Sequence, residues 1–497
     1  MNRRQILQSF SGVAASAILT PELAQAAAQL RQGAASGVNW QVAFGDLDAD
    51  LPRAPMKRIH GRAPVDLAGS LYRNGPGKFH RPGGSVDHWF DGDGLMRAFR
   101  VSDGAATLEA RFIDTHKRRV ETAANAVIQP GFGTASKPGA QVRNADDVNP
   151  GNISVMSMGG ELWALWEGGS PIAMDPRDLS TKGMKTLRDD LAHMPYLAHM
   201  PYLAHPRRDP GGDVWSLGLS GSQAIVWRVS AEGALKGADM VKLPMASYVH
   251  DFTATRRHLI LILQPWVQDK MVMPYADSFT WRPEMGTRVL VLDKADLTKR
   301  RIYELPPFFA FHYGSAWEET DGTLRFDGCL TEDSRFATAN GKAFMKGTYE
   351  PEPASILTLV TLRPDGRATL EPTGVMAEFP RVDGRRSGDT RRYTIHATAT
   401  APNVPLFHGV ATYDWKTGKS DTFDFGATHL MEEAVFVARP GGSEELDGWL
   451  MAPSVNIKAK ATELHVFDAR RVAAGPLCTW RSEHVLPVSL HGAFVKA

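Results

Sequence analysis

The stretch TRVLVLDKADLTKRRIYEL, residues 287–305, contains the local pattern that decides the fold. An apolar run ends at a polar turn around Asp293, and a second run follows the turn. Two β-rich runs that are separated by Asp and other turn-forming residues predict an antiparallel hairpin.

The same pattern recurs six more times along the chain. The turns contain Asp-Gly, Glu-Gly or Thr-Gly pairs or an Asp-x-x-x-Leu/Val step, all of which punctuate strands. The further hairpins are predicted at residues 96–112, 170–187, 224–243, 356–375, 409–425 and 462–477.

The hairpins are spread along the whole chain. Their turns lie at Asp103, Asp175, Glu232, Asp293, Asp365, Thr417 and Asp468, so successive turns are 72, 57, 61, 72, 52 and 51 residues apart. A four-stranded propeller blade takes roughly 40–50 residues, and more with loops. The spacing therefore predicts an all-β, seven-bladed β-propeller, which is favoured over an irregular all-β protein with many hairpins.

Four histidines occupy a similar position relative to these turns. His250 lies 18 residues after Glu232, His312 lies 19 after Asp293, and His491 lies 23 after Asp468. His205 lies 30 residues after Asp175, or 18 once two surplus copies in the tandem repeat LAHMPYLAHMPYLAH (191–205) are removed. We expect this position to be the innermost strand of each blade, so that the four imidazoles meet on the propeller axis.

Converging neutral imidazoles require a cation. Imidazole suits Fe, Zn, Cu and Ni. Closed zinc sites usually contain cysteine or a carboxylate, so a set of four histidines favours iron with open coordination positions. Glu378 and Glu433 lie 13 and 16 residues after their turns, where they are candidates to hold the second N–H of a ligand. The alternative is that both are ordinary surface residues.

The N-terminus predicts export. Arg3-Arg4 precedes a short apolar run from residue 10 to 19 and then Ala24-Gln25-Ala26. This order is typical of a twin-arginine signal peptide over residues 1–26, which leaves a mature domain at 27–497 in the periplasm. The alternative is a disordered tail that happens to contain two arginines. The apolar run is too short to span a bilayer permanently.

Composition excludes several other functions. The net charge is +1, so nothing indicates a nucleic-acid partner. The sequence contains no G-x-S-x-G, H-E-x-x-H or P-loop motif, so we expect no catalytic residues beyond a metal site. Two distant cysteines, Cys329 and Cys478, are interpreted as buried small apolar residues rather than a disulfide.

Eight segments, taken together, resemble the conserved blocks of the carotenoid cleavage oxygenase family in their family order. Among them are GSLYRNGPGKFHRPGGSVDHWFDGDGLMRAF and ELWALWEGGSPIAMDP. The segments are residues 69–99, 161–176, 204–210, 248–262, 308–319, 377–382, 432–439 and 489–495.

The resemblance implies a propeller with a loop or helical cap over its metal-bearing face and an apolar tunnel leading to Fe(II). It implies His205, His250, His312 and His491 as ligands, with Glu167, Glu378 and Glu433 as their partners. Glu167 enters only through the resemblance. The implied reaction is the O2-dependent cleavage of a conjugated C=C bond of an apolar carotenoid or apocarotenoid, which gives two carbonyl products.

Four alternatives are considered. Relatives that cleave stilbenes carry a Tyr and a Lys at positions that align near Leu108 and Trp166. Both residues are apolar here, which favours a carotenoid or apocarotenoid over a stilbene. The chain could also be a non-oxidative propeller with structural histidines. Residues 270–286 are interpreted either as a lid or peripheral membrane contact, or as an ordinary cap. His193 and His199 match part of the first ligand block, but only His205 is followed by Pro-Arg-Arg-Asp-Pro.

Overall fold

The computed structural model describes residues 39–187, 199–349, 353–400 and 404–497. The predicted signal peptide at 1–26 and His193 lie outside the described residues. The described residues form an all-β, propeller-like arrangement of antiparallel sheets, as the hairpin pattern predicts.

Five sheets have four strands each. The first sheet contains β7 (Ser154–Met158), β8 (Glu161–Leu165), β9 (Ile172–Met174) and β10 (Thr181–Met184), and the second contains β11 (Arg207–Arg208), β12 (Val214–Ser220), β13 (Gln223–Val229) and β14 (Leu235–Lys242). The third contains β15 (Thr253–Ala254), β16 (His258–Leu263), β19 (Thr287–Asp293) and β20 (Asp296–Leu305). The fourth contains β21 (Trp317–Glu318), β22 (Leu324–Leu330), β23 (Ile356–Leu362) and β24 (Ala368–Met376), and the fifth contains β25 (Glu378–Arg381), β26 (Tyr393–Thr398), β27 (Gly409–Asp414) and β28 (Lys419–Asp424).

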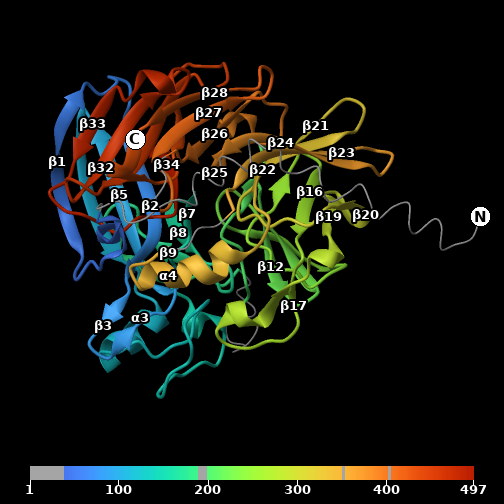
Figure 1. The fold of residues 1–497 in the computed structure, drawn as a ribbon, viewed down its shortest axis with the longest axis horizontal. Helices are drawn as coiled ribbons and strands as arrows, with labels where there is room; N and C mark the ends of the chain where they lie inside the picture. The colour runs from blue at the N-terminus through green and yellow to red at the C-terminus, as the bar shows by residue number, and fades with distance from the viewer. Residues whose placement is uncertain (1–38, 188–198, 350–352, 401–403) are drawn as a thin grey trace, which may run out of the picture.

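A ten-stranded sheet joins the two ends of the chain. It contains β1 (Leu51–Gly61), β2 (Gly69–Lys78), β5 (Asp93–Ser102), β6 (Ala105–Phe112), β29 (His429–Met431), β30 (Val435–Ala438), β31 (Gly448–Asn456), β32 (Ala461–Asp468), β33 (Cys478–Arg481) and β34 (His491–Lys496). The last strand, β34, pairs with β2, and β33 pairs with β1, so C-terminal strands lie beside N-terminal strands (Figure 1).

All seven predicted hairpins are antiparallel strand pairs. The continuous apolar run of β16 shows why such strands pack between sheets. Leu259, Leu261 and Leu263 pack into one apolar cluster with the second sheet, whereas Ile260 and Ile262 pack into another with the fourth. Because successive side chains of a strand point to opposite faces, a strand that is covered on both faces is apolar throughout.

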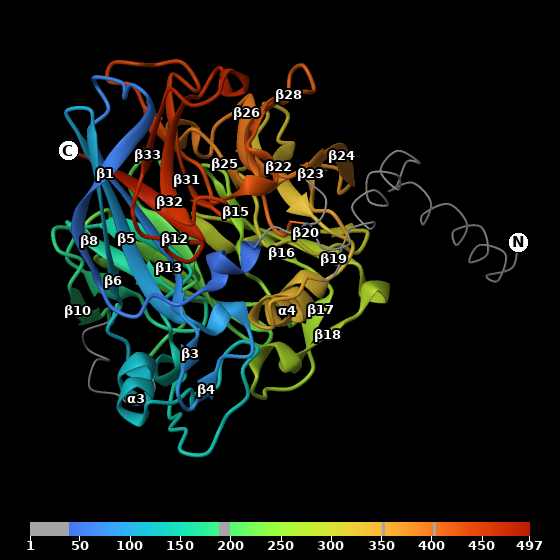
Figure 2. The same ribbon diagram turned by 60° about the vertical axis from the view of Figure 1, so that its left-hand side comes forward.

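Short elements outside these sheets gather on one side of the molecule (Figure 2). They include the small hairpins β3 (His80–Arg81) with β4 (Gly84–Ser85) and β17 (Trp266–Gln268) with β18 (Phe279–Trp281), and the helices α3 (His116–Ala124) and α4 (Gly341–Met345). Cys329 and Cys478 are buried and unpaired, in agreement with the interpretation of the sequence.

The remaining helical elements of the described residues are single turns. They are η1 (Trp40–Phe44), η2 (Trp89–Asp91), η3 (Ala145–Val148), η5 (Tyr275–Ser278), η6 (Pro283–Met285), η7 (Phe336–Asn340, a π-helix), η8 (Gly384–Arg386), η9 (Gly426–Thr428) and η10 (Val472–Ala474).

Candidate metal centre

Four histidines from four segments that are far apart in the sequence meet at one site. Nε2 of His250 lies 3.0 Å from Nε2 of His205 and 3.3 Å from Nε2 of His312, and Nε2 of His312 lies 3.1 Å from Nε2 of His491. One nitrogen from each ring lies within 4.8 Å of the other three. The four rings therefore present their nitrogens to one common point.

The hairpin count predicts that all four histidines lie on innermost strands, and the structure differs from this prediction. His205, His250 and His312 precede β11, β15 and β21 by a few residues, and only His491 is part of a strand, β34. The residues before a strand are free of its pleat, so their side chains can turn toward the axis rather than alternate between the two faces of a sheet.

Burial keeps most of these imidazoles neutral. Burial lowers the pKa of His205 and of His250 well below the usual value, and it lowers the pKa of His491 to about 4. Burial also acts to lower the pKa of His312, but the carboxylates of Glu378, Asp251 and Glu433 together outweigh it and raise that pKa. A neutral imidazole has a lone pair to offer, so the cluster suits a cation.

Each predicted glutamate contacts one histidine. Glu167 Oε1 pairs with His250 Nδ1, Glu378 Oε2 lies 2.5 Å from His312 Nδ1, and Glu433 Oε1 lies 2.9 Å from His491 Nδ1. An imidazole that donates Nδ1–H to a carboxylate has its lone pair on Nε2, which points at the common point.

Glu433 belongs to a buried charge network that sequence reasoning missed. Arg73, which is fully buried, lies 3.3 Å from Glu433 Oε2, and Arg381 Nε lies 2.8 Å from Glu433 Oε1. Burial alone would raise the pKa of Glu433, but Arg381, His491 and Arg73 together lower it. Arg73 and Arg381 lie inside the sequence blocks quoted above, but no spacing rule singles them out.

An Arg–Asp pair ties the backbone beside three of the histidines together. Arg207 Nη2 donates to Asp251 Oδ1 at 2.6 Å and to the carbonyl oxygen of Tyr313 at 3.0 Å. Asp251 Oδ2 in turn accepts the Tyr313 backbone N–H at 2.9 Å. These residues follow the histidines at 205, 250 and 312 by one or two positions. The pair therefore holds in place the backbone from which each of the three imidazoles extends. This pair was also not predicted.

Tyr248 provides a further unpredicted contact. Its hydroxyl lies 2.9 Å from Glu167 Oε2, where it donates a hydrogen bond. His205 has no carboxylate partner among the described residues, which distinguishes it from the other three histidines. His199, the alternative from the tandem repeat, lies apart from the cluster, with its Nδ1 2.8 Å from Asp146 Oδ2.

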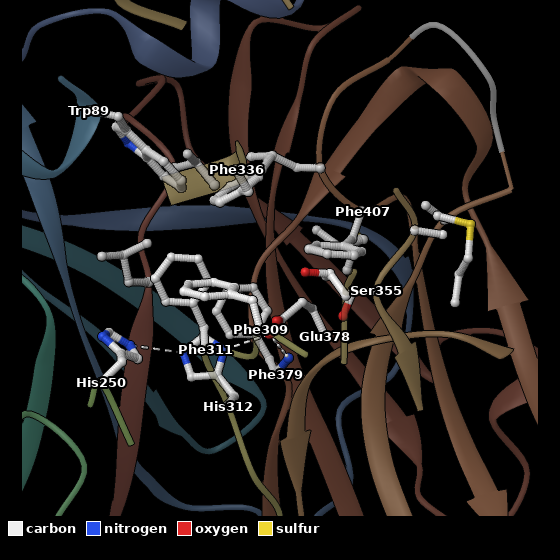
Figure 3. A pocket seen from close by; sticks show the side chains of 18 of the residues that line it. Trp89, His250, Phe309, Phe311, His312, Phe336, Ser355, Glu378, Phe379 and Phe407 are labelled. Carbon is white, nitrogen blue, oxygen red and sulfur yellow. Dashed lines mark hydrogen bonds and ion pairs between the residues drawn. The ribbon is translucent and has the colours of Figure 1, made fainter. Parts of the chain in front are cut away.

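An apolar pocket opens onto three of the histidines (Figure 3). Trp89 and Phe336 lie across it from His312 and Phe379, and Phe309 and Phe311 pack beside the imidazoles (Figure 3). The remaining apolar lining includes Phe90, Ile153, Met376, Val404, Leu406, Phe407, Met431 and Leu490. Such a surface binds apolar molecules and excludes water.

Two buried polar groups of residues that line the pocket have no hydrogen-bond partner among the described residues. They are the Trp89 indole N–H and the Ser355 hydroxyl. An unsatisfied buried hydroxyl costs about 1–3 kcal/mol, so it favours a ligand that has an oxygen at this point. Leu108 and Trp166, the positions used above to argue about substrate, are not among the described residues that line the pocket. Leu108 is buried in the core of the ten-stranded sheet, so that argument was wrong.

A second cavity, which has a polar lining, also contacts three of the histidines. It is lined by Arg207, Asp251, Arg381 and Glu433 together with His205, His312 and His491. Phe379 lines both cavities, and its ring centroid lies 5.2 Å from those of His312 and His491. Its φ of 54° is unfavourable for a bulky residue. Phe379 therefore stands between the apolar pocket and the polar cavity.

The donor set fits a divalent transition metal. Four nitrogen ligands converge, three of them are oriented through Nδ1 by carboxylates, and the surroundings are buried. Imidazole is a ligand for Fe, Zn, Cu and Ni, and hydrogen-bonded carboxylates are the usual outer partners of metal-bound histidines.

The family model for the retinal pigment epithelial membrane protein, RPE65, matches residues 46–496. Resveratrol cleavage oxygenase 1 of Aspergillus fumigatus is 28% identical over 474 residues, covering 88% of this chain and 91% of that protein. Apocarotenoid-15,15'-oxygenase of Synechocystis is 27% identical over 464 residues, covering 88% and 92%.

Solved structures share the fold. The cobalt-substituted apocarotenoid oxygenase of Synechocystis is 23% identical and has a TM-score of 0.82, covering 92% of this chain and 98% of that one. At this identity the likeness shows the fold alone.

Proposed function

The chain belongs to the retinal pigment epithelial membrane protein family, and from that membership we propose that it is an Fe(II)-dependent oxygenase that cleaves a conjugated C=C bond of an apocarotenoid. The observation that carries the proposal is the apolar pocket that opens directly onto His250, His312 and His491. An apolar chain that enters this pocket brings its double bonds next to the proposed metal position.

The four histidines would hold Fe(II), and Glu167, Glu378 and Glu433 would keep three of their rings in position. Four neutral ligands leave the charge of the metal uncompensated. When bound, Fe(II) supplies the activation of O2, and the alkene carbons become the carbonyl carbons of two products. The protein contributes orientation of the chain, a dry pocket and the metal ligands.

The pocket lining favours a polyene. Phe309, Phe311 and Phe379 offer flat apolar faces beside the histidines. Burial contributes about 0.8 kcal/mol for each CH2-sized unit. A long polyene therefore gains affinity along the whole pocket. The unpartnered Ser355 hydroxyl would pair with an oxygen at the end of the polyene, as in an apocarotenal or apocarotenol.

A hydroxylated stilbene is the second candidate. A relative that covers most of this chain is named a resveratrol cleavage oxygenase, and the same Ser355 hydroxyl could pair with a phenol. The stilbene is shorter than a polyene and buries less apolar surface, so we place it second.

The experiment compares apocarotenals with 4-hydroxystilbenes at equal Fe(II) loading, with products identified by mass. We expect higher kcat/KM for an apocarotenal. A clear preference for the hydroxystilbene would overturn the substrate class, and the absence of any cleaved product with an iron-loaded protein would overturn the reaction. Ser355→Ala should raise KM about 2–10-fold for substrates that end in oxygen and leave a hydrocarbon polyene unaffected, because it removes one hydrogen bond.

Two features of the fold belong to the same proposal. The ten-stranded sheet is interpreted as two blades joined through β33 and β1, which together with the five four-stranded sheets gives seven blades. The short elements on one side of the sheets, which include η2 and η7, would form the cap, because Trp89 and Phe336 from these elements line the apolar pocket.

We also propose periplasmic export by the twin-arginine route. Replacing Arg3 and Arg4 by lysine should block export, and normal export of that variant in cells without the route would contradict the idea.

Peripheral membrane contact would deliver an apolar substrate. The loop at 270–286 exposes Met271 by 72% and Met273 by 41%, and its Phe279 packs on Trp266, which belongs to the same apolar cluster as Phe309 and Phe311 of the pocket. No helix among the described residues is long and apolar enough to cross a membrane.

A further inference from the structure

A second group of metal-ligating side chains lies on one face of the ten-stranded sheet. His429 is on β29, and Glu463 and His465 are on β32. Ligand atoms from these three residues all lie within 4.8 Å of one another. The strand register explains the grouping, because His429 pairs with Asn456 on β31 and Ser454 on β31 pairs with Glu463. Residues two apart on a strand point to the same face.

The distances fit a small divalent cation. Glu463 Oε2 lies 3.1 Å from His429 Nε2 and 3.6 Å from His465 Nε2. A tetrahedral zinc ion with bonds of about 2.0–2.1 Å holds its ligand atoms roughly 3.3 Å apart. Two histidines and one glutamate are also a ligand set that zinc uses with water in the fourth position.

The hydrogen bonds around His429 leave two acceptors facing each other. The Thr428 hydroxyl donates to the carbonyl oxygen of Phe425 at 3.1 Å, so its oxygen accepts the Nδ1–H of His429 at 2.9 Å. The His429 lone pair is then on Nε2, where it points at the Glu463 carboxylate. Two acceptors at this separation repel each other unless a cation or a proton lies between them.

Asn456 disfavours the proton. Its Oδ1 accepts the backbone N–H of Ala459 at 2.8 Å, which fixes the orientation of the amide. Its Nδ2 is therefore a donor, which lies 3.0 Å from Glu463 Oε1 and 3.1 Å from His429 Nε2. A proton on Nε2 would face this donor. Because the amide can donate to Glu463 Oε1, the Nε2 lone pair of His429 remains available to a metal ion between His429 and Glu463.

Partner groups also orient the other ligands. Glu463 Oε1 accepts from Arg481 Nε at 2.7 Å, which leaves Oε2 directed at the two imidazoles. His465 Nδ1 lies 3.0 Å from the Thr479 hydroxyl, which can hold the imidazole through that nitrogen, as the outer partners of metal-bound histidines do. Its Nε2 lies 2.9 Å from the Ser454 hydroxyl, a contact that a metal ion on Nε2 would replace.

The group is shielded but reachable. The side chains of Glu463 and His465 are 2% and 1% exposed, and that of His429 is 12% exposed. The ring centroid of Phe425, from the segment after β28, lies 4.6 Å from that of His429 and 4.5 Å from that of His465. The Arg481 side chain is 38% exposed, so solvent screens its charge.

We propose that His429, Glu463 and His465 bind a second divalent cation of the zinc type, separate from the four-histidine centre. Water fills the fourth position at the exposed edge of His429. Because β29 runs directly into Glu432 and Glu433, this cation would anchor the strand that precedes the partner of His491.

The test is metal stoichiometry in the full-length protein. Chelator-stripped protein is titrated with Zn2+ and the bound metal is counted by mass spectrometry after desalting. We expect two ions per chain in the wild type and one in His312→Ala, because only the four-histidine centre is lost. We expect one in His465→Gln and none in the double variant. Co2+ bound to His312→Ala should give the visible spectrum of a tetrahedral site. The double variant, which also contains His465→Gln, should lack this spectrum.

His258→Gln is the matched control, because His258 is also buried beside a single glutamate, Glu318, but belongs to no such group. It should retain both ions. If His465→Gln fails to fold, His429→Gln at the exposed edge replaces it. One ion in the wild type and none in folded His312→Ala would overturn the proposal, whatever the four-histidine centre does. The proposal would also be overturned if His429→Gln and Glu463→Gln each still bound two ions per chain.

Discussion

The two histidine clusters of this protein differ in how the chain builds them. The four-histidine cluster takes three rings from segments that precede strands and one from β34, and three of its rings are held by carboxylates that come from further segments. The cluster of His429, Glu463 and His465 is built on two strands of one sheet, its carboxylate is itself a ligand candidate, and its imidazoles are held by hydroxyls. The first leaves the charge of a metal uncompensated beside an apolar pocket, whereas the second neutralises part of it away from that pocket. The difference indicates reaction chemistry at the first cluster and anchoring at the second.

The largest expected effect separates the clusters by activity. His250→Ala and His312→Ala should lose the central metal and nearly all C=C cleavage, because no neighbouring ligand can replace the missing ring. His199→Ala, from the tandem repeat, should keep both. Metal content and product formation are measured on the same samples. Loss of metal in His199→Ala with retention in His205→Ala would mean that the ligand from the repeat is misassigned.

The carboxylates of the four-histidine cluster should give a smaller effect. Glu167→Gln and Glu378→Gln should weaken metal affinity or activity by roughly 10–100-fold, because each glutamine still contacts its histidine but holds no charge. Glu433→Gln should also lower the free energy of unfolding by about 3–5 kcal/mol, because Arg73 and Arg381 lose a buried partner. Chemical denaturation checks the stability, and metal titration checks the affinity. If all three variants bound the metal with wild-type affinity, the carboxylates would have no role in holding the metal ligands.

The second cluster should affect stability rather than reaction. Glu463→Gln should leave kcat/KM within about 2-fold of wild type while its melting temperature falls, because Arg481 loses a buried carboxylate. A matched measurement on His258→Gln gives the background for losing a buried polar pair. Loss of cleavage in a folded, iron-loaded Glu463→Gln protein would break the contrast between the two clusters.

The smallest effect is expected from the tandem repeat. Deleting one six-residue copy, residues 191–196, should leave metal content and activity unchanged, because the copy that contains Tyr202 and His205 keeps its contacts. Metal analysis of the shortened chain is the measurement. A shortened chain that folds but binds no central metal would show that the extra length is needed to position His205.

The sequence by itself determined the strand pairs and the residues that meet at the centre. A hairpin is a local structure, so turn residues and apolar runs within about 20 residues are enough to predict it. Because the hairpins repeat, four histidines at similar offsets from their turns were expected to meet, and their nitrogens do lie together. Glu378 and Glu433 followed from the same count, whereas Glu167 needed the family resemblance.

Only the tertiary structure decided the contacts between segments that share no repeat. Arg73 meets Glu433, and Arg207 meets Asp251 beside His312, because different sheets bring them together across long sequence separations. Leu108 lies in an apolar core rather than in the pocket, so the substrate prediction from it was wrong, because an alignment gives a position in the chain but not the cavity that the residue faces. The cluster of His429, Glu463 and His465 depends on strand register, and a shift of one residue would turn its side chains to the opposite face. Register follows from pairing and packing, which local sequence does not fix.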